Sequence, residues 1–348
     1  MRDYNIDSTV LTRKFYQKTL EKALEIFVLL EGIRSIYQFG NISAPGNSDI
    51  DLLFVIDDDE SVSREIFNSF ETKFSNEEKY IIYEHAPLIT GKNIIENIHY
   101  IRKLGNLVHL YGEQYIFNDI KDKWIKLYQL VELMIQYYPI VYYNNADHPL
   151  RWRFQLINAF RFTWNQLLEV LNDFGYKLQY LNEEYIEKVS KLLLENAKRR
   201  ESIKHDSSDK EFVRQTENAL IRIIDLMYSE LDQCLIMLFP TITERTIIGN
   251  RLFESDYSGK IEVKTINLLI KQFSFISYPA IFTTFFIDEL VLEPQIKKAI
   301  EKRNQVINQY YYFISNYSLK RSLYTPWWIE SNTMKNKIGK LIIQFFGE

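Results

Sequence analysis

The strongest constraint on the fold of this chain is the nearly unbroken apolar run at residues 50–56, which reads Ile-Asp-Leu-Leu-Phe-Val-Ile. A run of this length, which ends at four acidic residues, 57–60, predicts a β-strand. Apolar side chains then occupy both faces of the strand, so we expect it to be covered on both sides by other elements. The run therefore predicts a strand buried within a sheet.

Helices and strands are predicted to alternate around this strand. In chain order, we expect a helix over residues 12–30, a strand over residues 33–39, a helix from Ser61 to about residue 74, a strand over residues 80–84 and helical structure over residues 93–110. This mixture of short strands and helices indicates an α+β domain, which we place at residues 1–118.

Beyond about residue 120 the pattern changes to long helices. Apolar side chains recur at helical spacing over residues 124–138, 154–171, 185–194 and 212–238. Further helical stretches follow over residues 241–348. We therefore predict an α+β protein in which a mainly α-helical region, residues 119–348, follows the first domain, with a candidate subdivision near residue 240.

Composition and charge narrow the classes of function. The formal net charge of −4 gives no general attraction to a nucleic-acid duplex or to an anionic membrane. The single cysteine, Cys234, lies in an apolar run, which excludes a disulfide framework and predicts a small buried side chain. The polar N-terminus lacks the apolar core of a signal peptide, so we expect a cytoplasmic protein that does not associate with membranes.

Two carboxylates, Asp49 and Asp51, stand where the apolar strand begins. Successive side chains of a strand point to opposite faces, so we expect these two to lie on the same side. Such a pair is suited to a divalent cation such as Mg²⁺ or Mn²⁺. Gly40, in the turn before the strand, would let a polyphosphate approach the backbone. The alternative is a solvated strand entrance with an accidental spacing of acids.

Two motifs in this region, Gly40-Asn41 and Ser48-Asp49-Ile50-Asp51, resemble the signature of the polymerase-beta-type nucleotidyltransferase superfamily. The pattern of that family is an apolar strand, Gly-Ser or Gly-Gly, a variable turn, and Asp-x-Asp at the start of a second apolar strand. The resemblance covers roughly residues 10 to 118. It implies a nucleotidyltransferase-like mixed sheet with flanking helices.

The resemblance also implies roles for individual residues. Asp49 and Asp51 would bind the metal, and Gly40, Asn41 and Ser48 would contact the triphosphate. The second motif position is asparagine in this chain, where serine is usual, and its side-chain amide can donate a hydrogen bond to phosphate.

A third carboxylate normally completes a site of this kind. Glu84 is the candidate, because it ends the strand predicted at residues 80–84 and would lie beside Asp51 there. It would act as a third metal ligand or as a general base.

The implied function is a magnesium-dependent nucleotidyltransferase, which moves a nucleoside monophosphate from a nucleoside triphosphate to an acceptor hydroxyl and releases pyrophosphate. ATP is the expected triphosphate. The acidic chain favours a small molecule or a protein as acceptor over a polynucleotide. The alternative keeps the fold without the reaction, as a nucleotide-binding, regulatory or antitoxin-like module.

Overall fold

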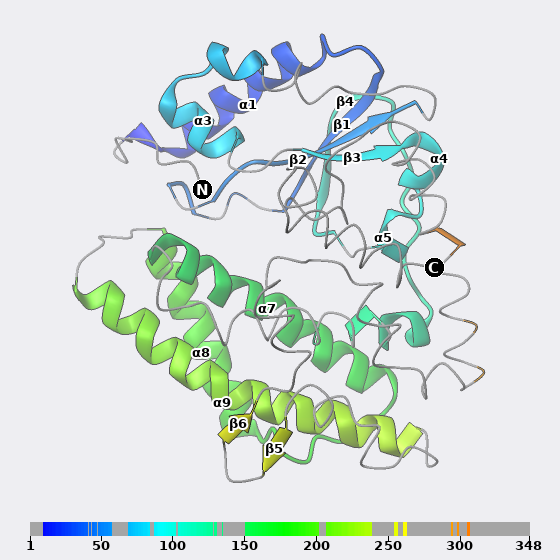
Figure 1. The fold of residues 1–348 in the computed structure, drawn as a ribbon, viewed down its shortest axis with the longest axis vertical. Coiled ribbons are helices and arrows are strands. Elements are labelled where there is room, and N and C mark those ends of the chain that lie inside the picture. Colours follow the sequence, from blue (N-terminus) through cyan, green and yellow to red (C-terminus); the bar gives the residue numbers. More distant parts are fainter. Residues whose placement is uncertain are drawn as a thin grey trace. The chain divides into compact units, whose positions relative to one another are not determined.

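The computed structural model describes residues 10–40, 42, 44–46, 48–57, 69–83, 87–101, 104–127, 129–130, 134, 150–201, 207–238, 254–256, 260–262, 294, 298 and 305–306. The fold is α+β (Figure 1). The chain divides into two compact units, the first made of Met1–Ile120 with Lys302–Glu330 and the second of Lys121–Glu301 with Ser331–Glu348. The first contains a mixed sheet with helices, and the second contains three long helices.

The first unit is built on a four-stranded sheet in the order β3-β2-β1-β4. The strands are β1 (Ile33–Phe39), β2 (Asp51–Ile56), β3 (Leu88–Gly91) and β4 (Leu107–Gly112). β1 runs antiparallel to both β2 and β4, whereas β3 runs parallel to β2. All residues of β2 after Asp51 are buried. The predicted strands at residues 33–39 and 50–56 are therefore confirmed, and the second is central and covered.

Helix α1 (Arg13–Phe27) precedes the sheet and packs against α3 (Asn76–Ile82), as Figure 1 shows. The side chain of Thr12 begins α1 by accepting a hydrogen bond from the Phe15 N–H at 3.2 Å. At the other end of the helix, the buried ring of Phe27 meets that of Phe54 in β2, with centroids 5.6 Å apart. α1 therefore covers the sheet face to which Phe54 points, which confirms the helix predicted from apolar spacing.

The strand predicted at residues 80–84 is wrong, because residues up to Ile82 belong to α3. The reason lies at the helix start, where Ser75 and Glu78 form a capping box. The Glu78 N–H donates to the Ser75 hydroxyl at 3.3 Å, and the Ser75 N–H donates to the Glu78 carboxylate at 2.7 Å. The strand that pairs with β2 on the side away from β1 is β3 instead.

Only part of the helical structure expected over residues 93–110 is present. Two one-turn helices, α4 (Lys92–Ile95) and α5 (Ile98–Ile101), are followed by β4. β4 ends at Gly112, whose φ is 80°. A Cβ there would lie 1.9 Å from the Arg34 carbonyl oxygen, so no other residue fits this close approach of β4 to β1. Most of the helix expected from Ser61 lies outside the described residues, and Phe70–Lys73 form a 3₁₀ turn.

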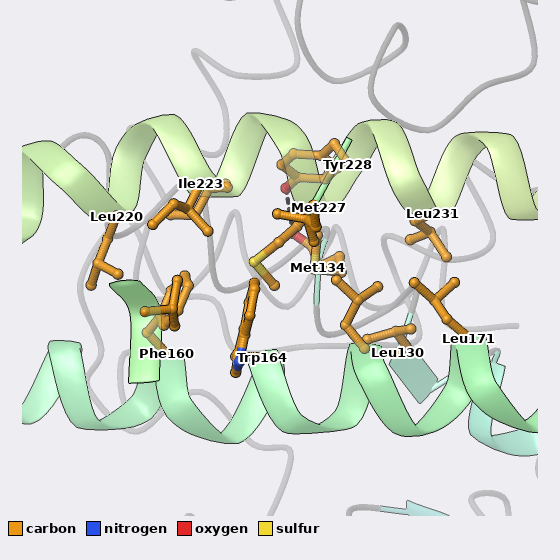
Figure 2. Packing of buried hydrophobic residues seen from close by; sticks show 14 of the residues in the cluster. Leu130, Met134, Phe160, Trp164, Leu171, Leu220, Ile223, Met227, Tyr228 and Leu231 are labelled. Carbon is orange, nitrogen blue, oxygen red and sulfur yellow. Dashed lines mark hydrogen bonds between the residues drawn. The ribbon is translucent and has the colours of Figure 1, made fainter. Parts of the chain in front are cut away.

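The second unit contains α7 (Leu150–Asp173), α8 (Glu183–Arg200) and α9 (Ser207–Leu238). Figure 2 shows side chains of α7 and α9 facing one another across a buried apolar core. The residues labelled there are Leu130, Met134, Phe160, Trp164, Leu171, Leu220, Ile223, Met227, Tyr228 and Leu231. The predicted apolar stripes of these helices are thus confirmed. The helices expected over residues 241–348 lie almost wholly outside the described residues, which include a short antiparallel pair, β5 (Glu254–Asp256) and β6 (Lys260–Glu262).

Cys234 of α9 is fully buried in this core, as predicted. Burial raises the pKa of its thiol to about 12, and the nearby carboxylate of Glu230 adds to the shift. The thiol is therefore a packing group and not a nucleophile. Within the described ranges, no helix is long and apolar enough to span a membrane.

Candidate functional site

The two carboxylates singled out from the sequence lie at the beginning of β2. Asp49 and Asp51 are both half-buried, whereas Ile50 between them is buried. This alternation fits a placement of both carboxylates on the same side of the chain. Two anionic groups near one surface, partly shielded from water, are chemically suited to a hard divalent cation such as Mg²⁺.

Gly40 follows directly after β1 and lies next to Asp51. β1 and β2 pair so that Phe39 is opposite Asp51. A Cβ built on Gly40 would lie 3.7 Å from the Asp51 Oδ2 atom, and the φ of Gly40 is 78°, where a side chain is strained. The structure therefore brings together two of the predicted site residues, one glycine backbone and one carboxylate, through the register of β1 and β2.

The turn that leads into Asp49 is held by Tyr16, a residue of α1 with 1% of its surface exposed. The Tyr16 hydroxyl donates a hydrogen bond to the Ser48 carbonyl oxygen at 2.5 Å and accepts one from the Gly46 N–H at 3.0 Å. The sequence places Tyr16 within the helix predicted over residues 12–30 but gives no sign of this second role. Its hydroxyl fixes the turn from the core side.

Ser48 is itself part of this turn. The Ser48 N–H donates to the Ala44 carbonyl oxygen at 2.8 Å, and the Ala44 N–H donates to the Ser48 hydroxyl at 3.3 Å. The side chain is buried and shapes the turn. Its expected contact with a triphosphate stays a prediction.

Replacing Tyr16 with phenylalanine is expected to lower the free energy of unfolding by about 1–3 kcal/mol, because the partly buried N–H of Gly46 and the buried C=O of Ser48 lose their shared partner. Urea unfolding measures this loss. The turn before Asp49 also loosens, so Mg²⁺ binding followed by calorimetry should weaken. Tyr228→Phe is the matched control, since the Tyr228 hydroxyl donates to the Met134 carbonyl oxygen at 2.6 Å in the second unit. It should lower stability but leave Mg²⁺ binding unchanged, and equal Mg²⁺ binding by both variants would contradict the role of Tyr16.

The C-terminal end of α3 also reaches this site. The Ile50 N–H donates to the Ile81 carbonyl oxygen at 2.7 Å, between the two carboxylates in sequence. Asn41 and Glu84, two further predicted site residues, lie outside the described residues. Among the residues that are described, no three His, Cys, Asp or Glu side chains gather into a metal site.

The far end of β2 is followed by another carboxylate, Asp57, the first of the four acidic residues at which the apolar run ends. Asp57 is buried and forms ion pairs with Arg34 and with Lys92, the latter at 2.9 Å. The hydrogen bonds from Arg34 and Lys92 hold the pKa of this carboxyl below its usual range. Asp57 is thus neutralised by the protein itself and is unsuited to bind a cation.

Arg153 of α7 is held by an acidic residue of another helix. It forms a two-pronged ion pair with Glu217, in which the Arg153 Nε atom donates to Oε1 at 2.9 Å. This pair joins α7 to α9. The candidate site is the entrance of β2, where Gly40 and Asp51 meet. We compared the chain with models of protein families, with curated proteins and with solved structures, and none of them matches.

Proposed function

We propose that this protein is a magnesium-dependent nucleotidyltransferase, with its site at the entrance of β2. The observation that carries the proposal is the position of the Asp51 carboxylate beside Gly40, where a Cβ built on the glycine would lie 3.7 Å from the Asp51 Oδ2 atom. A metal ligand and a backbone that a phosphate can approach then stand side by side, which is what transfer from a metal-bound triphosphate requires. A mixed sheet with flanking helices is consistent with a nucleotidyltransferase-like fold.

In this proposal each residue has a distinct task. Asp49 and Asp51 hold Mg²⁺, and Gly40 and Asn41 contact the triphosphate. When bound, the ion supplies charge neutralisation at the phosphates and activation of the attacking hydroxyl. Ser48 holds the turn and so keeps Asp49 in position.

Glu84 is the proposed third carboxylate, although the strand on which it was expected does not exist. Its support is now the hydrogen bond between Ile50 and Ile81, which fixes the chain three positions before Glu84 at the entrance of β2. Three residues span at most about 11 Å, so a place for this carboxylate beside the same cation is compatible with the length of the chain.

The acceptor that we propose is a hydroxyl on a small molecule or on a protein. The formal net charge of −4 disfavours a polynucleotide. A second candidate is a nucleotide-binding, regulatory or antitoxin-like module that lacks turnover. It is favoured by Asn41, which replaces the usual serine of the motif.

The two candidates are separated by incubating the protein with α-labelled ATP, CTP, GTP or UTP, Mg²⁺ and fractionated cell extract. The enzyme is expected to release pyrophosphate and to transfer label to an acceptor in one fraction, with ATP preferred, and chelation of the metal should stop both. Binding of triphosphate without release of pyrophosphate in every fraction would reject the enzyme and favour the module.

A further inference from the structure

A second glycine, Gly105, lies against Gly40 at the same edge of the sheet. A Cβ built on Gly105 would lie 3.6 Å from both the backbone N and the Cα of Gly40. Gly105 is exposed, whereas Leu104 before it is buried and anchors this stretch of chain. The pairing of Phe39 with Leu107 explains the contact, because it carries the chain before β4 past the end of β1.

Three groups therefore follow one another across neighbouring strands. The Asp51 carboxylate lies next to the Gly40 backbone, and the Gly40 backbone lies next to Gly105. A side chain at position 105 would begin over the N–Cα bond of Gly40. If it were longer than a methyl group, it would extend over the surface on which the proposed triphosphate rests.

Folding alone does not require glycine at position 105. Its φ is outside the left-handed region, and a Cβ would make contacts at ordinary van der Waals distance. Gly112 differs, since there an added Cβ would collide with the Arg34 carbonyl oxygen. An exposed glycine costs conformational entropy on folding, so its presence calls for another reason.

We infer that Gly105 is a positioning residue of the nucleotide site, whose missing side chain leaves the Gly40 amide open to a phosphate oxygen. This inference rests on the proposed function. A bulkier residue at position 105 would keep the fold and block the approach of the triphosphate.

The test compares Gly105→Ala and Gly105→Val with the unaltered chain. Calorimetry with Mg²⁺ and a non-hydrolysable ATP analogue gives the dissociation constant, and thermal unfolding gives the midpoint. Valine is expected to raise the dissociation constant roughly 10- to 100-fold, the effect of losing one charge-assisted hydrogen bond, and alanine to raise it less. In turnover, KM for the triphosphate should rise more than kcat falls.

Gly175→Ala is the matched control, because Gly175 has a φ of 66°, open space around it and a place in the second unit. It should lower the midpoint and leave the dissociation constant unchanged. A folded Gly105→Val variant that binds the analogue as tightly as the unaltered chain overturns the inference. If the valine variant does not fold, the alanine variant decides, and unchanged binding by it overturns the inference too.

The inference and the proposed function fail in different ways. If the unaltered chain binds none of the four triphosphates with Mg²⁺, both are rejected. If it releases pyrophosphate, but both Gly105 variants bind the analogue as well as it does, the inference alone is rejected.

Discussion

Replacing Asp51 with asparagine is expected to lower the rate of pyrophosphate release roughly 1,000-fold, because the metal loses a charged ligand and with it several kcal/mol of transition-state stabilisation. Asparagine has nearly the same shape as aspartate, and Asp51 is only half-buried at the start of β2. The fold should therefore persist. Single-turnover release of pyrophosphate at saturating Mg²⁺ and triphosphate measures the effect on chemistry.

The control makes the same chemical change in the second unit. Asp173 at the end of α7 pairs with Lys126 at 2.9 Å, and Asp173→Asn should leave the rate unchanged. Asp49→Asn should resemble Asp51→Asn, because both carboxylates are proposed to hold the metal. A normal rate in Asp51→Asn, with a normal thermal midpoint, would remove Asp51 from the site.

Replacing Glu230 with alanine is expected to lower the free energy of unfolding by about 4 kcal/mol, because four hydrogen-bond donors, two of them buried and two partly buried, lose their acceptor at about 1 kcal/mol each. Glu230 lies on α9 and is fully buried. Its carboxylate accepts hydrogen bonds from the N–H groups of Gln179, Tyr180 and Leu181 at 2.6–3.0 Å, and from the Tyr176 hydroxyl at 2.9 Å.

This carboxylate therefore fixes the segment between α7 and α8 to α9. Urea unfolding of Glu230→Ala measures the loss. The free energy of unfolding of Glu230→Gln should lie between those of the unaltered chain and of Glu230→Ala, because the glutamine amide keeps one acceptor oxygen. Glu187→Ala is the control, since Glu187 pairs with Lys191 on the exposed side of α8 and its removal should leave the urea midpoint unchanged. Equal midpoints for Glu230→Ala and Glu187→Ala would mean that the segment is held by other contacts.

The sequence predicts elements well where one physical signal dominates. The apolar run that became β2 has no other stable place than a covered strand, and the stripes of α7, α8 and α9 have a clear helical period. The segment around Tyr80 and Ile81 carries competing signals. Its β-branched and aromatic residues favour a strand, but the capping box at Ser75 starts a helix that includes them. The capping box is visible in the sequence, and it outweighs the strand propensity of this short segment.

The candidate site was predictable only as far as strand geometry reaches. Gly40 and Asp51 meet because one ends a strand and the other begins the neighbouring strand, which the motif spacing indicates. The contacts of Tyr16 and Gly105 depend on how distant segments pack, and Tyr16 bonds a residue 32 positions away. The role of Glu230 could not be predicted from the sequence either. Its partners include three main-chain N–H groups, which every residue type except proline carries.

The ion pairs of Asp57 have a consequence for the opposite end of the same strand. Arg34 belongs to β1, and Lys92 follows β3 directly, so Asp57 ties β2 to both of its neighbours. A shift of β2 by one residue would turn Asp51 to the other face of the sheet and put Ile50 in its place. These ion pairs fix the pairing register of β2. The turn before β2 can then vary in length without moving Asp51 to the other face of the sheet.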